Sequence, residues 1–84
     1  MSRIAPHPGE MLAEEFMQPL GLSARQLAQA LGVPHNRISE MMAGRRTMTA
    51  DTALRLERYF GTEARFWMRL QAAFDLSKAR AAGN

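Results

Sequence analysis

The stretch SARQLAQALGVPHNRISEMMAG, residues 23–44, decides the fold of this 84-residue chain. It holds two segments with the apolar periodicity of one helix face, with apolar residues at positions 27, 28 and 31 and again at 38, 41 and 42. Gly32 between them suits the positive φ at which a helix ends, and Pro34 presets φ for the start of the next helix. Two helices joined by a three-residue turn with glycine form the helix-turn-helix pattern.

The same pattern would fit either a DNA-reading pair of helices or a plain helical hairpin inside a bundle. The residues on the outer face of the second segment distinguish these two interpretations. With Ile38 facing the core, a step of about 100° per residue turns Asn36 and Glu40 outward. At the leading end and on the flanks lie His35, Arg37 and Ser39. Asparagine can bond adenine bidentately, arginine can bond guanine, and glutamate can accept from cytosine. The pattern therefore favours the DNA-reading interpretation.

Positive charge is concentrated on the same stretch. Residues 23–46 contain four arginines and one glutamate, whereas residues 1–22 contain one arginine and three glutamates. Arg45 and Arg46 follow the second segment directly, where the phosphates of a bound duplex would run. The formal net charge is +3, and ten of the eleven basic residues are arginine, which suits bidentate contacts to phosphate and guanine. This distribution is the footprint expected of a DNA-facing side.

Length and composition exclude several other classes of protein. Eighty-four residues suffice for one domain, predicted over 1–84, and the absence of cysteine excludes disulfides and thiolate metal sites. There is neither an apolar run of about 18 residues nor a signal-peptide pattern, so we expect a cytoplasmic, nucleoid-associated protein with no membrane partner. The two histidines lie far apart, and no nucleophile, base or metal-binding group converges. We therefore predict no enzyme activity, no catalytic residue, no metal and no cofactor.

Abundant alanine, leucine, methionine, arginine and glutamate predict an all-α fold. At the N-terminal end we expect a flexible lead-in over 1–7, a first helix over about 8–18, and a capping box of Ser23 and Gln26 that starts the second helix. After the helix-turn-helix we expect a helix over 50–60, capped by Thr49, and a helix from 63 to about 78, capped by Thr62. Residues 79–84 are expected to form a frayed tail. The first helix is expected to stop before Pro19, because proline disfavours helical geometry at the preceding residue.

The last predicted helix has more apolar surface than a small core requires. Phe66, Trp67, Leu70 and Phe74 cover a broad arc of it, and the first two lie about 100° apart. Either all four side chains pack in the core, or part of the arc buries a two-fold partner. These four residues are therefore the candidate dimer interface.

The outer face of the first predicted helix is acidic. It carries Glu10, Glu14 and Glu15. Such a face is ordinarily solvated surface, and its alternative role is to dock a basic partner protein.

Five blocks of the sequence together resemble the HigA-type antitoxins of the XRE, or lambda-repressor-like, helix-turn-helix superfamily over roughly residues 7–80. The blocks are HPGE at 7–10, EEFMQPLGLS at 14–23, LAQALGVPHNRISEMMAGRR at 27–46, MTADTALRLERYFGT at 48–62 and FWMRLQAAFDL at 66–76. The resemblance implies a five-helix lambda-repressor-like DNA-binding domain that dimerises. Its helix-turn-helix occupies the second and third helices.

The resemblance also implies partners and contact residues. Members of this family bind the double-stranded, palindromic operator of a toxin–antitoxin operon, repress it, and bind a RelE-like toxin of the HigB type that cleaves mRNA on the ribosome. By position, Ser23, Arg25 and Gln26 would lie on the phosphate side. The base-reading set would be His35, Asn36, Arg37, Ser39 and Glu40. The alternative function is that of a stand-alone XRE-type transcriptional repressor without a toxin, and a more distant one is an enzyme subunit or RNA-processing factor.

Overall fold

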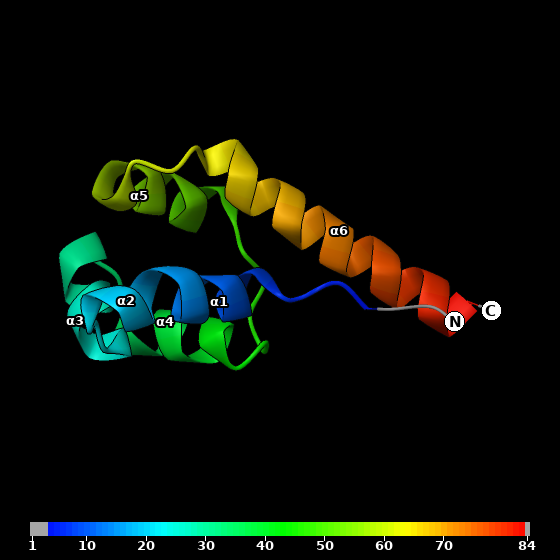
Figure 1. The fold of residues 1–84 in the computed structure, drawn as a ribbon, viewed down its shortest axis with the longest axis horizontal. Helices are drawn as coiled ribbons and strands as arrows, with labels where there is room; N and C mark the ends of the chain where they lie inside the picture. The colour runs from blue at the N-terminus through cyan, green and yellow to red at the C-terminus, as the bar shows by residue number, and fades with distance from the viewer. Residues whose placement is uncertain (1–3, 84) are drawn as a thin grey trace.

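The computed structural model describes residues 4–83, and this range contains helices and loops but no strand (Figure 1). A first helical rod comprises α1 (Pro8–Met11), a π-helical segment (Leu12–Met17) and α2 (Gln18–Leu20). It is followed by α3 (Ala24–Leu31), α4 (His35–Met42), α5 (Ala50–Phe60) and α6 (Ala64–Gly83). With the first rod counted as one helix, the described residues form five helices, which confirms the predicted all-α class.

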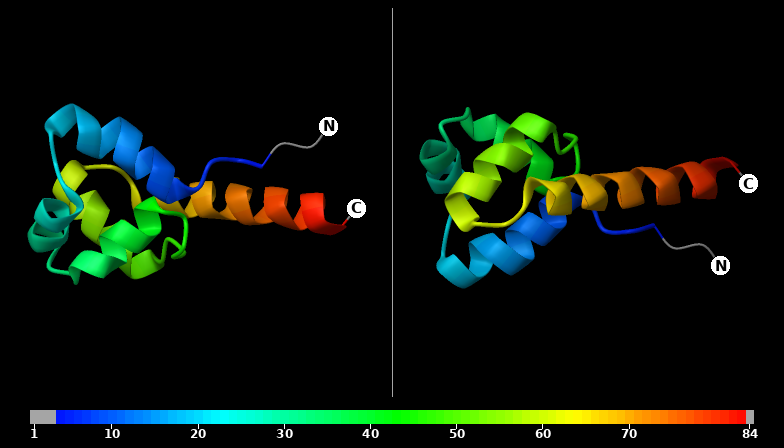
Figure 2. Two further views of the ribbon diagram at one scale, coloured as in Figure 1. Left: turned by 90° about the horizontal axis from the view of Figure 1, so that it is seen from below. Right: turned by 90° about the horizontal axis from the view of Figure 1, so that it is seen from above.

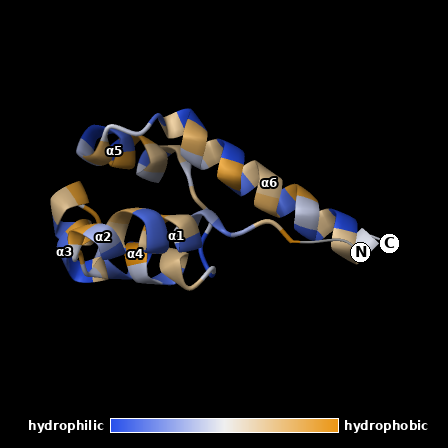
Figure 3. Cartoon of the chain, in the orientation of Figure 1, coloured by the Kyte–Doolittle hydropathy of each residue, from blue (hydrophilic) through white to orange (hydrophobic). Residues whose placement is uncertain are grey.

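The helices α1 to α5 and the N-terminal half of α6 surround one core, and the C-terminal half of α6 extends away from it. Figure 2 shows the C-terminal half of α6 projecting beyond the other helices in both views, and the principal axes measure 41, 22 and 21 Å. The core side chains are Leu12, Met17, Leu27, Ala28, Leu31, Ile38, Met41, Met48, Ala53, Leu56 and Trp67. Figure 3 shows apolar residues interleaved with polar ones along α6. Over the described range, no helix is long and apolar enough to cross a membrane.

The first helix does not stop before Pro19, so that prediction was wrong. The π-helical segment shifts the backbone bonding from the fourth to the fifth preceding residue, and the N–H of Gln18 donates to the carbonyl of Ala13. Pro19 follows directly, at the start of α2, where this widened turn accommodates a residue without an N–H. Gly21 then ends the rod in the left-handed region, with φ at 65°.

The HPGE sequence at 7–10 sets α1 directly against α4. His7 is the N-cap of α1, and its Nδ1 accepts from the N–H of Gly9 at 2.9 Å. Burial lowers the pKa of His7, while a hydrogen bond with the backbone of Arg46 acts in the opposite direction, so the ring is neutral and able to accept at neutral pH. A Cβ added to Gly9 would lie 1.8 Å from the carbonyl oxygen of Met41 in α4. Only glycine permits this approach of the two backbones.

The helix α6 differs from its prediction at both ends. It begins at Ala64, whose N–H donates to a carboxylate oxygen of Glu57 at 2.6 Å. The predicted cap, Thr62, accepts instead from the indole Nε1 of Trp67 at 2.8 Å. At the other end α6 continues to Gly83, beyond the predicted end near 78, because alanine and arginine at 79–82 are strong helix formers. Residue 84 of the predicted frayed tail lies outside the described residues.

The predicted lead-in contacts the middle of α6. The N–H of Ala5 donates to Oγ of Ser77 at 2.9 Å, and the ring of His7 meets the edge of Phe74 with centroids 4.8 Å apart. Residues 1–3 of this segment lie outside the described residues. The flexibility of the lead-in stays a prediction.

Candidate nucleic-acid interface

The turn between α3 and α4 fixes how the two helices are joined. Gly32 ends α3 in the left-handed region with φ at 73°, and the N–H of Val33 donates to the carbonyl of Ala28 at 3.0 Å. Pro34 has φ at −62° and ψ at 146°. Because its ψ is extended, it lies just before α4 as the N-cap and is not the first helical residue that we expected.

Buried side chains between α3 and α4 decide which face of α4 meets solvent. Ala28, Leu31, Ile38 and Met41 are at most 6% exposed, as their spacing predicted. The small side chain of Ala28 lets the two helices cross closely. Of the predicted base-reading set, His35 and Asn36 are exposed, and Arg37, Ser39 and Glu40 are half-buried. All five residues of the predicted base-reading set therefore lie in the N-terminal part of α4.

The predicted phosphate-side residues gather at the N-terminus of α3. Ser23 Oγ accepts from the N–H of Gln26 at 3.1 Å, and Gln26 Oε1 accepts from the N–H of Ser23 at 2.9 Å, which confirms the capping box. Both side chains keep donors for another partner, the hydroxyl hydrogen of Ser23 and the amide group of Gln26. Arg25 between them is exposed. Contact of these three with phosphate stays a prediction.

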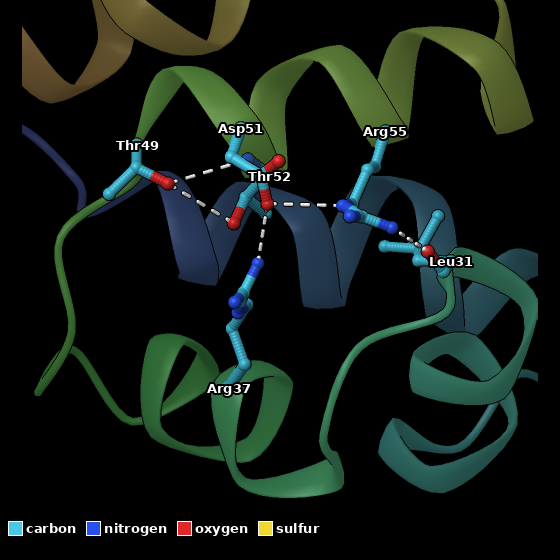
Figure 4. Close-up of polar contacts among 6 residues, drawn as sticks. All are labelled: Leu31, Arg37, Thr49, Asp51, Thr52 and Arg55. Carbon is cyan, nitrogen blue, oxygen red and sulfur yellow. Dashed lines mark hydrogen bonds and ion pairs between the residues drawn. The ribbon is translucent and has the colours of Figure 1, made fainter.

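A carboxylate on α5 binds two arginines from different helices (Figure 4). Oδ2 of Asp51 lies 2.6 Å from Nη1 of Arg37 on α4 and 3.0 Å from Nε of Arg55 on α5. Nη1 of Arg55 also donates to the carbonyl of Leu31, the last residue of α3, at 2.7 Å. These contacts join α3, α4 and α5 to one another.

A second ion pair joins α4 to the loop that follows it. Oε1 of Glu40 accepts from Nη2 of Arg46 at 2.7 Å and from Nε at 3.1 Å. Arg45 is exposed, and its side chain has no ion pair among the described residues. Between the two ion pairs lies a shallow cleft of about 230 Å³, lined by Arg37, Arg46, Thr47, Thr49, Asp51 and Thr52. All six lining residues have polar or charged side chains.

Comparison with known proteins identifies the class to which this arrangement belongs. A family model described as helix-turn-helix matches residues 14–67. Virulence-associated protein I of Dichelobacter nodosus is 55% identical over 75 residues, covering 89% of this chain and 69% of that protein. Antitoxin HigA-1 of Vibrio cholerae is 39% identical over 72 residues, covering 86% of this chain and 68% of that protein. This chain belongs to the HigA-type antitoxins of the helix-turn-helix superfamily.

The solved structures agree with this assignment. The antitoxin HigA of Pseudomonas aeruginosa, solved with the higBA promoter, superimposes with a TM-score of 0.90 at 42% identity, covering 93% of this chain and 85% of that chain. The HigA family consists of DNA-binding proteins and not of enzymes. The predicted family and fold class are thereby confirmed.

The candidate dimer interface of this HigA-type chain loses one of its four predicted residues. Trp67 is 0% exposed, its indole donates to Thr62, and its ring packs 5.0 Å from that of Phe16. It belongs to the core of the single chain, because burial and its hydrogen bond leave nothing of it for a partner. Phe66 remains 37% exposed, and Leu70 and Phe74 are half-buried.

Sequence reasoning missed Asp51 and Arg55 as the residues that join α3, α4 and α5 beside the predicted base-reading set. Their spacing of four residues on one helix was a readable signal for an ion pair. The link to Arg37 has no such signal, because the two residues are 14 positions apart and meet only when α5 packs beside α4.

Proposed function

We propose that this chain is the DNA-binding antitoxin of a toxin–antitoxin operon. It binds a palindromic operator as a homodimer, represses its own operon, and neutralises a RelE-like, mRNA-cleaving toxin of the HigB type. The observation that carries the proposal is the exposed polar face of α4 in a chain of the HigA family. Several structural relatives were solved with promoter or operator DNA, the Pseudomonas aeruginosa HigA above with the higBA promoter, which supports the DNA-binding part.

In the proposed complex α4 enters the major groove. Asn36 and Glu40 face the base edges, and the arginines beside the helix neutralise phosphates. Arg25 and Arg45 are the most available of these, because both are exposed and make no ion pair among the described residues. One recognition helix reads only a few base pairs, so a second copy placed about 34 Å away supplies the remaining specificity on a palindromic site.

The projecting half of α6 supports the proposed dimer. It carries Leu76 and Ala79, which follow Ala72 and Ala73 along the helix, and all four residues are exposed, Leu76 at 53%. The N-terminal segment contacts this half at Ser77 and Phe74. A second α6 crossing there would remove this apolar surface from water, which stabilises an interface by about 25 cal/mol per Å² before association costs.

The acidic face of the first helical rod supports a toxin partner. Glu10, Glu14 and Glu15 are all exposed. An enzyme that cleaves mRNA must bind a polyanion, so its surface is basic around the substrate, and an acidic protein surface complements it. In this role the protein acts in the cytoplasm, at the nucleoid.

The test of the toxin partnership is co-expression with the product of the adjacent gene. We expect a purified complex in which mRNA cleavage is inhibited. The double variant Glu14→Lys and Glu15→Lys should weaken that complex by about 10-fold or more while leaving operator affinity within about two-fold, because neither residue belongs to the proposed DNA contacts. Absence of any complex, combined with intact operator binding, would favour the stand-alone repressor. Absence of both would overturn the proposal.

A further inference from the structure

Arg37 is the one arginine of the predicted base-reading set, and the fold directs it away from the outermost face of α4. Figure 4 shows its side chain crossing from α4 to the first turn of α5, where it meets Asp51. The distance of 2.6 Å between Nη1 and Oδ2 is that of a charge-assisted hydrogen bond. A side chain with five donors and a permanent charge is thus held to one direction before DNA arrives.

Asp51 is itself held in place. Nε of Arg55 donates to the same carboxylate oxygen at 3.0 Å, and Arg55 is anchored by the carbonyl of Leu31 at 2.7 Å. Asp51 also lies in the first turn of α5, where the helix dipole favours a negative charge. Hydrogen bonds from Arg37 and then Arg55 lower the pKa of Asp51, so the carboxylate is charged wherever DNA binding is measured.

The location of this network argues for a role in binding more than in stability. The side chains of Arg37, Asp51 and Arg55 are 29%, 58% and 35% exposed, and ion pairs with this much solvent contribute little to folding. Arg37 and Asp51 line the cleft beside α4 together with Arg46 and three threonines. A carboxylate on a surface that faces phosphates repels them, so its presence there requires a compensating gain.

We propose that Asp51 is a positioning residue that sets DNA specificity by holding Arg37 against α5. The inference rests on the proposed DNA-binding function. A free arginine beside the recognition helix would reach a phosphate on any duplex, because phosphate contacts carry no sequence information. Paired with Asp51, Arg37 adds less to sequence-independent attraction and offers its remaining donors in a fixed direction. Asp51 thereby lowers binding to random DNA more than binding to the operator.

The test compares wild type with Asp51→Asn, which keeps the shape of the side chain and removes its charge. Affinity is measured for an operator duplex and for a scrambled duplex of equal length, over a series of salt concentrations. We expect Asp51→Asn to bind the scrambled duplex about five-fold or more tighter than wild type and to gain less affinity for the operator. The slope of log affinity against log salt concentration on scrambled DNA should steepen by up to about 0.9, the value of one additional phosphate contact.

Two further variants separate positioning from a general change in charge. Glu15→Gln removes one negative charge from a residue with no ion pair in the described range, and it should leave the operator-to-scrambled ratio unchanged. In the Arg37→Ala background, Asp51→Asn should lose most of its effect on that ratio, because the arginine that it releases is gone.

Two results would overturn the inference. In the first, wild type prefers the operator and Asp51→Asn has the same operator-to-scrambled affinity ratio. In the second, Asp51→Asn changes that ratio as much in the Arg37→Ala background as in wild type. The proposed function survives either result. If wild type binds operator and scrambled duplexes equally, the proposed function fails, and the inference that rests on it fails too.

Discussion

Replacing Gly9 with alanine is expected to lower the free energy of unfolding by about 3 kcal/mol or more. The new Cβ would lie 1.8 Å from the carbonyl oxygen and 2.4 Å from the carbonyl carbon of Met41. Both atoms are backbone atoms of α4, so no side-chain rotation relieves the overlap, and the helices α1 and α4 must separate. For a chain of this size the loss corresponds to a fall in Tm of more than about 10 °C. Thermal and urea unfolding followed by circular dichroism measure it.

Gly83→Ala is the matched control. It makes the same chemical change in α6, where an added Cβ meets nothing within 4 Å. Its stability should stay within about 0.5 kcal/mol of wild type. Equal stability of Gly9→Ala and wild type would contradict the close approach of Gly9 to the backbone of Met41.

Replacing Leu76 with glutamate is expected to convert the protein to a folded monomer and to weaken operator binding by about 100-fold or more. The side chain is 53% exposed in the single chain, so a charge there should not disturb the core. In the proposed dimer it would be buried and unpaired, which opposes association. A monomer loses the gain in affinity that comes from linking two recognition helices on one duplex. Light scattering gives the mass, and titration with the operator gives the affinity.

Leu54→Glu is the control for this experiment. Leu54 is 46% exposed but lies on α5, away from the projecting half of α6. That variant should remain a dimer. A Leu76→Glu protein that is still dimeric would place the two-fold interface elsewhere on the molecule.

The sequence predicted the parts of the fold that depend on local chemistry. The helix over 50–60 was located correctly at both ends, because Thr49 caps its first turn and Gly61 adopts φ 81° after its last residue. The capping box at Ser23 and the turn at Gly32 follow from the same kind of local signal. The inward spacing of Leu27, Leu31, Ile38 and Met41 was equally readable, since one apolar face per helix is what an amphipathic segment buries.

The parts that were not predicted depend on contacts between segments far apart in the chain. The first helix continues past Pro19 because a π-helical turn precedes the proline. No sequence signal other than the proline itself indicates that turn. Trp67 belongs to the core because it packs against Phe16 and donates to Thr62, and both partners lie outside α6. The pattern of α6 alone therefore does not reveal it. The pairs Arg37–Asp51 and Glu40–Arg46 likewise form only after α4, its following loop and α5 come together. For the same reason, the engagement of Arg37 and Glu40 in ion pairs within the chain could not be predicted from the sequence.

The measurement that tests the central claim most directly is binding to an operator set changed one base pair at a time, for wild type and for Asn36→Ala. Asn36 is exposed on α4, and its side chain makes no hydrogen bond or ion pair among the described residues, so its truncation leaves the fold intact. If α4 reads bases, Asn36→Ala should lose about 1–3 kcal/mol of discrimination at one position in each half-site and keep its preferences at the others. An equal loss of affinity on every sequence, operator and non-operator alike, would contradict base reading by α4.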